Sequence, residues 1–279
     1  MTIDLNQTLF AIIFGSCIGS FLNVLIWRLP RNESPIQPRS YCPKCKAKIH
    51  WYENIPLLSW LIQQGLCRSC KQRISVRYPF IEILCAALYI CCNFAEPNSL
   101  SNNSEEFIRL AGWILVPILI TLSVIDIDKL WLPESLCRLG FFSGLFIIIV
   151  NGFNLESNYS ASYYLDHLVA IIIAYFGFEV VRIFSHYIFH KPALGRGDSK
   201  LAAVLGIWLG INGLAISIMI TFILAGLYVM VLLILNRAKN YKVIPLGPFL
   251  SIGALSVWFL GNDFWFNVMY ILNQSIFPT

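Results

Sequence analysis

Long apolar runs recur along the whole chain, and they constrain its fold more than any other feature. A helix needs about 20 apolar residues to cross a hydrocarbon core about 30 Å thick. The composition agrees, since 57% of residues are hydrophobic and 13% are charged, whereas soluble domains carry about a quarter charged residues. The predicted segments are 8–27, 79–95, 107–126, 138–151, 165–185, 200–212, 213–235 and 247–272. We therefore expect an all-α polytopic membrane protein with about eight transmembrane helices.

Residues 201–235 are the ambiguous part of this assignment. They could form one long helix, but the sequence GING at 210–213 is typical of a turn between two shorter ones. The basic residues favour two helices: with eight segments and an outside N-terminus, 19 of the 20 Lys and Arg residues fall inside, and only Arg109 falls outside. The net charge of +5 therefore indicates membrane topology and not nucleic-acid binding. The first run follows no positive segment and has no cleavage site, which favours a retained helix.

A polar insert of residues 28–78 separates the first two segments and contains two C-x-x-C pairs. The sequence CPKC supplies Cys42 and Cys45, CRSC supplies Cys67 and Cys70, and 21 residues separate the two pairs. This spacing is typical of a zinc ribbon, whose four thiolates leave no open position for catalysis. Two disulfides are the alternative, but disulfides are rare on the cytosolic side, where the insert is predicted to lie. A redox pair is a weaker alternative, and His50 is a spare candidate ligand.

Two aspartates stand where predicted segments meet the inner side. Asp126 lies in VIDIDKLWLP at the end of the third segment, and Asp198 lies in LGRGDSKLAAVLG just before the sixth. Two carboxyl groups within hydrogen-bond reach share a proton, so the pair can perform general acid–base hydrolysis of a peptide bond. Gly195 and Gly197 flank Arg196 and could admit an extended peptide beside Asp198. From spacing alone, helix caps and solvated helix ends remain the stronger interpretation.

Other polar residues near the segments are weighed in the same way. Asp128 competes with Asp126, but residues two apart on a helix point in different directions. Glu179 is expected to pair with Arg182, whereas Glu82 has no obvious partner and is a functional candidate by default. The three histidines at segment edges are expected to cap or to be solvated: His167, His186 and His190.

With these residues in view, the sequence resembles the bacterial type IV prepilin peptidase and N-methyltransferase family, a group of GxGD-type membrane aspartyl proteases. Five stretches carry the resemblance from residue 15 to about 255, in the family's order. They are GSFLNVLIWRLP, the cysteine insert CPKCKAKIHWYENIPLLSWLIQQGLCRSCKQRISVRYPFIE, IDIDKLWLPE, GRGDSKL and IPLGPFLSIGAL. Glu134 is a mild departure, because the family often has Asp or Asn after the proline.

The resemblance implies an activity that spacing does not reveal. It implies that Asp126 and Asp198 are catalytic, and that the four insert cysteines belong to a cytoplasmic domain linked to methylation. The implied reaction removes the basic leader of prepilins and pseudopilins, and then methylates the new N-terminal amine with S-adenosylmethionine. The sequence shows no glycine-rich motif for that cofactor, so its binding residues stay unknown. The implied location is the bacterial inner membrane, with the active site at the cytoplasmic face.

The expected organisation is a first span at 1–27, the zinc-binding insert at 28–78 and the peptidase domain at 79–279. Gly195, Gly197 and Glu82 are candidates for a substrate channel. The expected partners are pilin precursors and the lipid bilayer, with no nucleic acid. Two other functions remain open: a proton-coupled carrier with an acidic relay, and a non-catalytic assembly factor that docks through its zinc ribbon.

Overall fold

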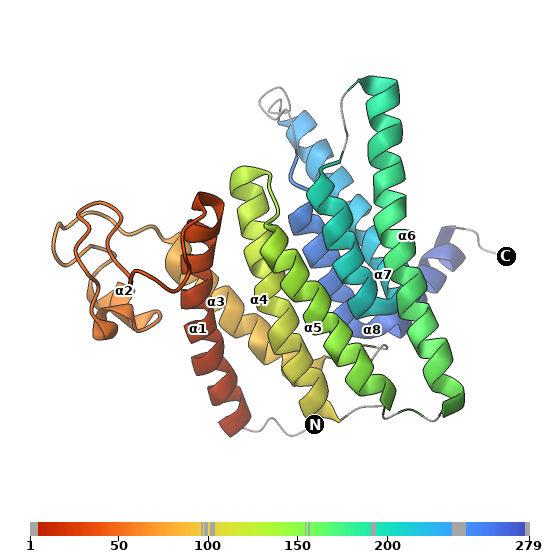
Figure 1. Ribbon diagram of the computed structural model, residues 1–279, viewed down its shortest axis with the longest axis horizontal. Helices are drawn as coiled ribbons and strands as arrows, with labels where there is room; N and C mark the ends of the chain where they lie inside the picture. The colour runs from red at the N-terminus through yellow and green to blue at the C-terminus, as the bar shows by residue number, and fades with distance from the viewer. Residues whose placement is uncertain are drawn as a thin grey trace. The chain divides into compact units, whose positions relative to one another are not determined.

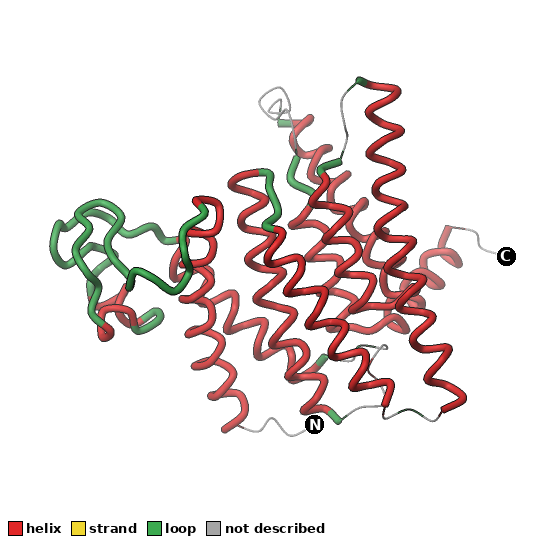
Figure 2. Tube along the Cα trace, in the orientation of Figure 1, coloured by secondary structure: helices red, strands yellow, loops and turns green. Residues whose placement is uncertain are grey.

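The structure is a computed structural model that consists of helices and loops, and no strand forms among the residues it describes (Figures 1 and 2). The described residues are 5–95, 97, 100, 104–153, 155, 157–190, 194–235 and 244–276. Within them, seven helices are long and apolar enough to cross a membrane. The expected all-α polytopic membrane fold is therefore confirmed. The chain divides into two compact units, Met1–Asn93 and Phe94–Thr279.

The first unit pairs two helices that flank the cysteine insert. Helix α1 (Leu5–Arg28) packs against α3 (Arg77–Cys91) through small residues. A methyl group added at Gly15 or Gly19 would come within 2.8 Å of Ala86 Cα or 2.7 Å of Glu82 Cα, so these helices approach closely only because glycine has no side chain. Short helical turns lie between and after them: η1 (Leu29–Arg31), η2 (Trp51–Asn54), α2 (Leu58–Ile62) and η3 (Cys92–Phe94). The rest of the insert is loop (Figure 2).

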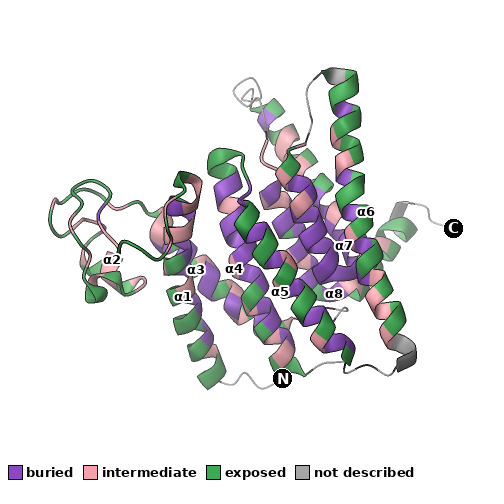
Figure 3. Cartoon of the chain, viewed as in Figure 1, coloured by how far each residue is buried: buried purple, intermediate pink, exposed green. Residues whose placement is uncertain are grey.

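The second unit is a bundle of five helices around the first half of α7. Its elements are α4 (Glu105–Lys129), α5 (Glu134–Phe153), α6 (Ser157–Phe189), α7 (Arg196–Ile234) and α8 (Gly247–Ile276). Helix α7 packs against α5, α6 and α8, and every residue from 201 to 210 is buried. Figure 3 shows this buried segment within the bundle, while the outer face of α6 is exposed. In a membrane, that exposed apolar face lies against lipid.

Helix α7 is two helices joined at Gly210, which has φ 68° and ψ −177°. This backbone region is essentially restricted to glycine, and it reverses the chain here. Before the break, α7 runs along α6 from Ser199, beside Glu179, to Ile207, beside His167. Beyond it, Thr221 reaches the carbonyl of Phe249, two residues into α8, so both ends of α7 lie at the same end of the bundle (Figure 1). The turn predicted at GING is confirmed, and α7, one of the seven candidate spanning helices, consists of two halves joined at Gly210.

Neighbouring residues of α6 cap both sides of this break. Asp166 accepts a hydrogen bond of 3.1 Å from the backbone N–H of Ile211, which starts the second half of α7. His167 is buried, and its Nδ1 lies 2.9 Å from the carbonyl oxygen of Ile207, near the end of the first half. These contacts satisfy backbone groups that a broken helix leaves unpaired. The expectation that His167 caps a helix end is confirmed.

The last helix contains a second break that the sequence analysis did not predict. Gly261 in α8 has φ 73° and ψ 166°, a conformation like that of Gly210. The fold also groups α3 with α1 in the first unit, so the second crossing packs with the first. A functional boundary at residue 79 remains a prediction, because packing does not test which segment performs which activity.

Candidate functional site

Asp126 lies in the last turn of α4 and is 5% exposed. Its Oδ2 atom accepts a hydrogen bond of 2.8 Å from the backbone N–H of Gly247, the first residue of α8. This N–H has no partner inside its own helix, so a carboxylate is a favourable acceptor there. A methyl group at Gly247 would lie 2.7 Å from Asp126 Oδ2, so the close approach requires glycine. The sequence analysis placed the stretch around Gly247 in a family motif but gave this residue no role.

Asp198 lies in the first turn of α7 and is 8% exposed. The helix starts at Arg196, two residues before Asp198, so Asp198 is the third helical residue and Gly195 is the N-cap. Asp198 Oδ2 accepts a hydrogen bond of 2.8 Å from the backbone N–H of Gly195. The structure therefore modifies the N-cap interpretation: Asp198 bonds back to the cap residue from inside the helix.

The two aspartates lie near each other in the bundle. Their carboxyl groups interact electrostatically, although 71 intervening residues separate them in the sequence. Each carboxyl group holds one backbone N–H on its Oδ2 atom. Among the described residues, no hydrogen bond is recorded to the Oδ1 atom of either. One oxygen of each group is thus held in place by a backbone N–H.

Contacts between the α4–α5 connection and the start of α7 keep these residues together. A methyl group at Gly197 would lie 2.8 Å from Leu132 Cβ, so the backbone beside Asp198 packs directly on the segment that follows Asp126. Glu134, which starts α5, forms an ion pair of 3.3 Å with Lys200. These two contacts join the first turn of α7 to the connection that follows α4.

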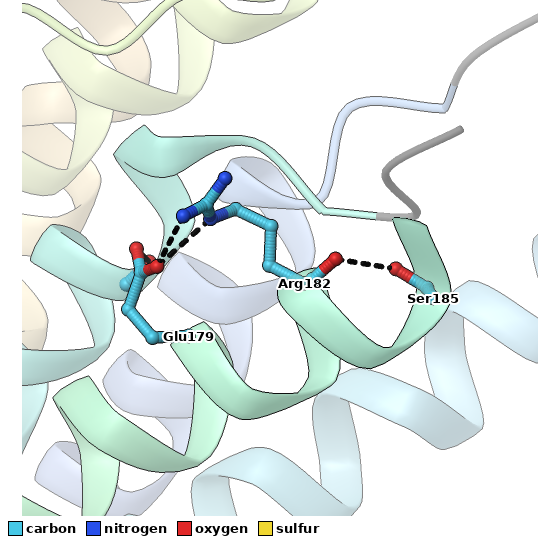
Figure 4. Close-up of polar contacts among 4 residues, drawn as sticks. Glu179, Arg182 and Ser185 are labelled. Atoms are coloured by element: carbon cyan, nitrogen blue, oxygen red, sulfur yellow. Dashed lines mark hydrogen bonds and ion pairs between the residues drawn. The ribbon is translucent and has the colours of Figure 1, made fainter. Parts of the chain in front are cut away.

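Glu179 of α6 contacts the same first turn of α7. Glu179 accepts hydrogen bonds from Arg182 Nε at 2.9 Å and Nη2 at 2.6 Å (Figure 4). Its other oxygen accepts a bond of 2.9 Å from the hydroxyl of Ser199, which is buried and follows Asp198 in the chain. The expected pairing of Glu179 with Arg182 is confirmed. The link to Ser199 was missed, because a contact between distant segments leaves no signal in residue spacing.

The remaining candidates have separate positions. Asp128 is exposed, whereas Asp126 is buried, which agrees with the expectation that only one of them faces the bundle. Gly195, just before α7, is exposed, and Gly197 packs on Leu132. A substrate channel along these glycines stays a prediction. Glu82 belongs to the first unit, where it accepts a hydrogen bond of 2.8 Å from the backbone N–H of Leu57. It therefore has a partner that the sequence did not reveal.

The four insert cysteines form one cluster. The Sγ atoms of Cys42, Cys45, Cys67 and Cys70 all lie within 4.8 Å of one another, and none of these cysteines forms a disulfide. Cys42 Sγ and Cys70 Sγ are 3.9 Å apart. Tetrahedral zinc with Zn–S bonds of about 2.3 Å separates its sulfurs by about 3.8 Å, so the cluster fits a structural zinc ion. Disulfide pairing is not supported.

The two C-x-x-C pairs are built alike. The backbone N–H of Cys42 donates to the carbonyl of Ala47, and the carbonyl of Cys42 accepts from the N–H of Lys46. Cys67 makes the same two hydrogen bonds with Gln72 and Lys71. Lys46 and Lys71 both have positive φ, at 61° and 55°. Burial opposes ionisation of Cys42, but the N–H groups of Cys45 and Lys44 lower the pKa of its thiol to about 7. These paired loops point backbone N–H groups at sulfur, which favours thiolates and hence metal binding.

The cluster does not favour a thiolate at every position. The N–H of Gln72 lowers the pKa of the Cys70 thiol, but burial and the other three thiols outweigh it and raise this pKa to about 11. Four neighbouring thiols therefore ionise together only when a cation balances their charge. That is the requirement that a zinc ion meets.

Comparison with known proteins assigns a family to this arrangement. Residues 13–95 match the Bacterial Peptidase A24 N-terminal domain, and residues 113–230 match the Type IV leader peptidase family. The first match contains the cysteine cluster, and the second contains Asp126 and Asp198. No solved structure matches the chain.

Curated relatives match along most of the chain. A Type 4 prepilin-like proteins leader peptide-processing enzyme of Escherichia coli O78:H11 is 32% identical over 90% of this chain and 93% of its own length. A Prepilin leader peptidase/N-methyltransferase of Aeromonas salmonicida is 32% identical over 87% of both chains.

A Myxococcus xanthus protein of the same name is 35% identical over 72% of this chain, which spans 55% of that protein. Both family domains occur here in order and together cover most of the sequence. The chain therefore belongs to the type IV leader peptidase family, and it is a protease of that family.

Proposed function

We propose that the protein removes the leader peptide of type IV prepilins and pseudopilins with Asp126 and Asp198, and then methylates the new N-terminal amine. One observation carries the peptidase assignment. Two buried carboxyl groups from distant helices interact in one site, and each keeps an oxygen clear of backbone hydrogen bonds. Family membership and the names of the relatives agree with it.

The chemistry follows from sharing one proton between two carboxyl groups. Two negative charges in one buried site repel each other strongly, so one group is protonated while the other is ionised. The ionised carboxylate accepts a proton from water as the water attacks the scissile carbonyl. The protonated group donates its proton to the carbonyl oxygen, and protons then pass to the leaving amine as the C–N bond breaks. No covalent enzyme intermediate is needed, and the proton belongs to the pair.

The backbone donors hold the reacting groups in position during these steps. Gly247 N–H fixes Asp126, and Gly195 N–H fixes Asp198, each through Oδ2. Because both donors lie at helix starts, their orientation is set by α7 and α8 and not by mobile side chains. A preorganised pair needs little rearrangement when charge moves between its members.

The proposed site faces the cytoplasm. Both aspartates lie at the end of the bundle where α4 ends and α7 begins, next to segments rich in Lys and Arg. Basic residues stay on the inner side of bacterial membranes. A precursor whose basic leader stays inside and whose apolar helix enters the membrane presents its cleavage point at this level.

The structure offers candidate ligands for zinc, whereas the described residues include no group assigned to S-adenosylmethionine. Zinc held by Cys42, Cys45, Cys67 and Cys70 supplies a cross-link that stabilises an insert too small to bury a sizeable core. The methylation proposal rests on the names of the relatives alone.

Mass spectrometry of a pilin precursor tests both activities at once. The precursor is produced with and without this protein, and its N-terminus is measured. We expect a shortened chain that begins after the leader and carries one added methyl group. An intact precursor would overturn the peptidase proposal, and a cleaved but unmethylated product would overturn only the methylation proposal.

A further inference from the structure

A short helix in the cysteine insert exposes an apolar face outside the spanning helices. Leu58, Leu61 and Ile62 lie on one side of α2, at positions i, i+3 and i+4, and are 57%, 63% and 80% exposed. Trp51, in the preceding turn η2, is 79% exposed. We define these four side chains as the α2 surface. Large apolar side chains gathered on a surface mark a contact site, so this surface is expected to have a binding partner.

The hydrogen bond between Leu57 and Glu82 sets the position of the α2 surface along the axis of α3. Leu57 immediately precedes α2, and its N–H donates to the carboxylate of Glu82 in α3. Glu82 lies five residues beyond Arg77, where the spanning segment begins, or about 7–8 Å along the helix axis. The interfacial layer on each side of a bilayer is roughly 5–8 Å thick. A helix that enters the membrane at Arg77 would therefore place the start of α2 at the level of the lipid interface.

The attachment at this point is tight. Leu57 has φ 62° and ψ −53°, and the N–H of Leu58 bonds to the carbonyl of Pro56 at 2.6 Å, which closes a rare and strained three-residue turn. Glu82 is 7% exposed and also bonds to the hydroxyl of Ser20 in α1. A strained turn held by a buried carboxylate orients α2 with respect to both helices of the first unit.

The charge of the insert fits an anionic surface. Residues 28–78 contain ten Lys and Arg residues and only two acidic ones, Glu33 and Glu53. Arg68, Lys71 and Arg73 lie in the segment after α2 and are exposed, and Arg68 also forms an ion pair with Glu53. Apolar and tryptophan side chains beside exposed basic residues are the composition of a segment that lies in the plane of an anionic lipid surface.

We propose that the α2 surface inserts into the interface of the bilayer, with the nearby basic residues against anionic lipid headgroups. Its depth, its apolar and tryptophan side chains and its positive surroundings agree on one occupant, which is lipid. The contact is continuous with the membrane that already surrounds α1 and α3. It holds the cysteine cluster close to the membrane, and it does not depend on the proposed catalytic activity.

Site-specific photocrosslinking of the full chain in nanodiscs with anionic lipid tests this contact. Benzoylphenylalanine replaces Leu61 in one variant and Trp51 in another, and the matched control replaces Lys48, which is exposed in the same insert. A zinc measurement on each variant shows that the insert has folded. The readout is the mass of the adduct after irradiation.

We expect lipid adducts at positions 61 and 51 to exceed those at position 48 on the order of tenfold, because the apolar face of an interfacial helix reaches the acyl chains. Adducts to residues 94–279 would mean that the second unit covers this surface, and adducts to an added pilin precursor would mean a protein partner. Either result overturns the proposal, as does equal labelling at all three positions.

Discussion

The backbone N–H of Gly247 donates a hydrogen bond of 2.8 Å to the carboxylate of Asp126, which lies 121 residues earlier in the chain. The start of α8 is thereby attached to the end of α4, at the point where we place the reacting groups. The same kind of contact joins Gly195 to Asp198 within α7. Each proposed catalytic carboxyl group is thus oriented by the backbone of a helix start, and this arrangement leads to specific predictions.

Replacing Gly247 with alanine should displace Asp126. The added methyl group would lie 2.7 Å from Oδ2, so the carboxyl group must move. A shift of about 1 Å in a catalytic group costs on the order of 10²-fold in rate, and we expect a loss of this size in leader cleavage. Gly226→Ala is the matched control, because nothing lies within 4 Å of that position. Equal rates for the two variants would contradict the role of Gly247.

The link between Glu179 and Ser199 should position Asp198. Ser199→Ala removes a buried hydrogen bond, worth about 1 kcal/mol, and frees one contact between α6 and the first turn of α7. We expect a lower kcat for leader cleavage with an unchanged KM, and partial rescue in Ser199→Thr, which keeps the hydroxyl. Ser143→Ala in α5 removes only a bond to its own helix and serves as control. A purely structural role would lower thermal stability and leave kcat unchanged.

Gly210 should be indispensable to the reversal of α7. Its positive φ disfavours any side chain, and an added methyl group would collide with the Asp166 carboxylate. Gly210→Ala should therefore cost about 1–3 kcal/mol of stability, measured as a lower Tm of the purified protein. Gly177→Ala, in α6, has open space around it and should leave Tm unchanged or slightly higher. A Gly210→Ala protein as stable as the parent would contradict the assigned break.

The cysteine cluster should bind one zinc ion per chain and release it in acid. Thiols bind zinc as thiolates, and the thiol pKa is about 7 at Cys42 and about 11 at Cys70. Protons therefore compete with the metal, so zinc content measured by elemental analysis should fall as pH is lowered and be retained as pH is raised. Cys42→Ser should lose the metal, while Cys137→Ser, in α5, should keep it. Metal retained by Cys42→Ser would reject the four-thiolate site.

The sequence predicted the parts of the molecule that depend on local patterns. Apolar length located the helices, GING indicated the turn at Gly210, and C-x-x-C spacing identified the metal cluster. Motif resemblance selected Asp126 and Asp198, although spacing alone favoured caps. The helices, the turn and the cysteine cluster are confirmed, because each is encoded within a few consecutive residues. The catalytic role of the two aspartates stays a prediction.

The rest could not be predicted, because it depends on contacts between distant segments. Nothing near Gly247 reveals that it approaches Asp126, and nothing near Leu57 reveals that Glu82 accepts its N–H. Likewise, the pairing of Glu179 with Ser199 requires the antiparallel packing of α6 on α7. In a membrane bundle, such polar contacts fix the register of helices whose apolar surfaces are otherwise interchangeable.

Leader cleavage by Asp126→Asn and Asp198→Asn is the most direct test of the proposed pair, with exposed Asp128→Asn as the matched control. Asparagine keeps the shape and the hydrogen bond to backbone N–H but cannot exchange a proton. Each of the first two variants should lose on the order of 10²–10⁴-fold in cleavage rate, while Asp128→Asn stays near the parent rate. Normal cleavage by either Asp126→Asn or Asp198→Asn would contradict the account.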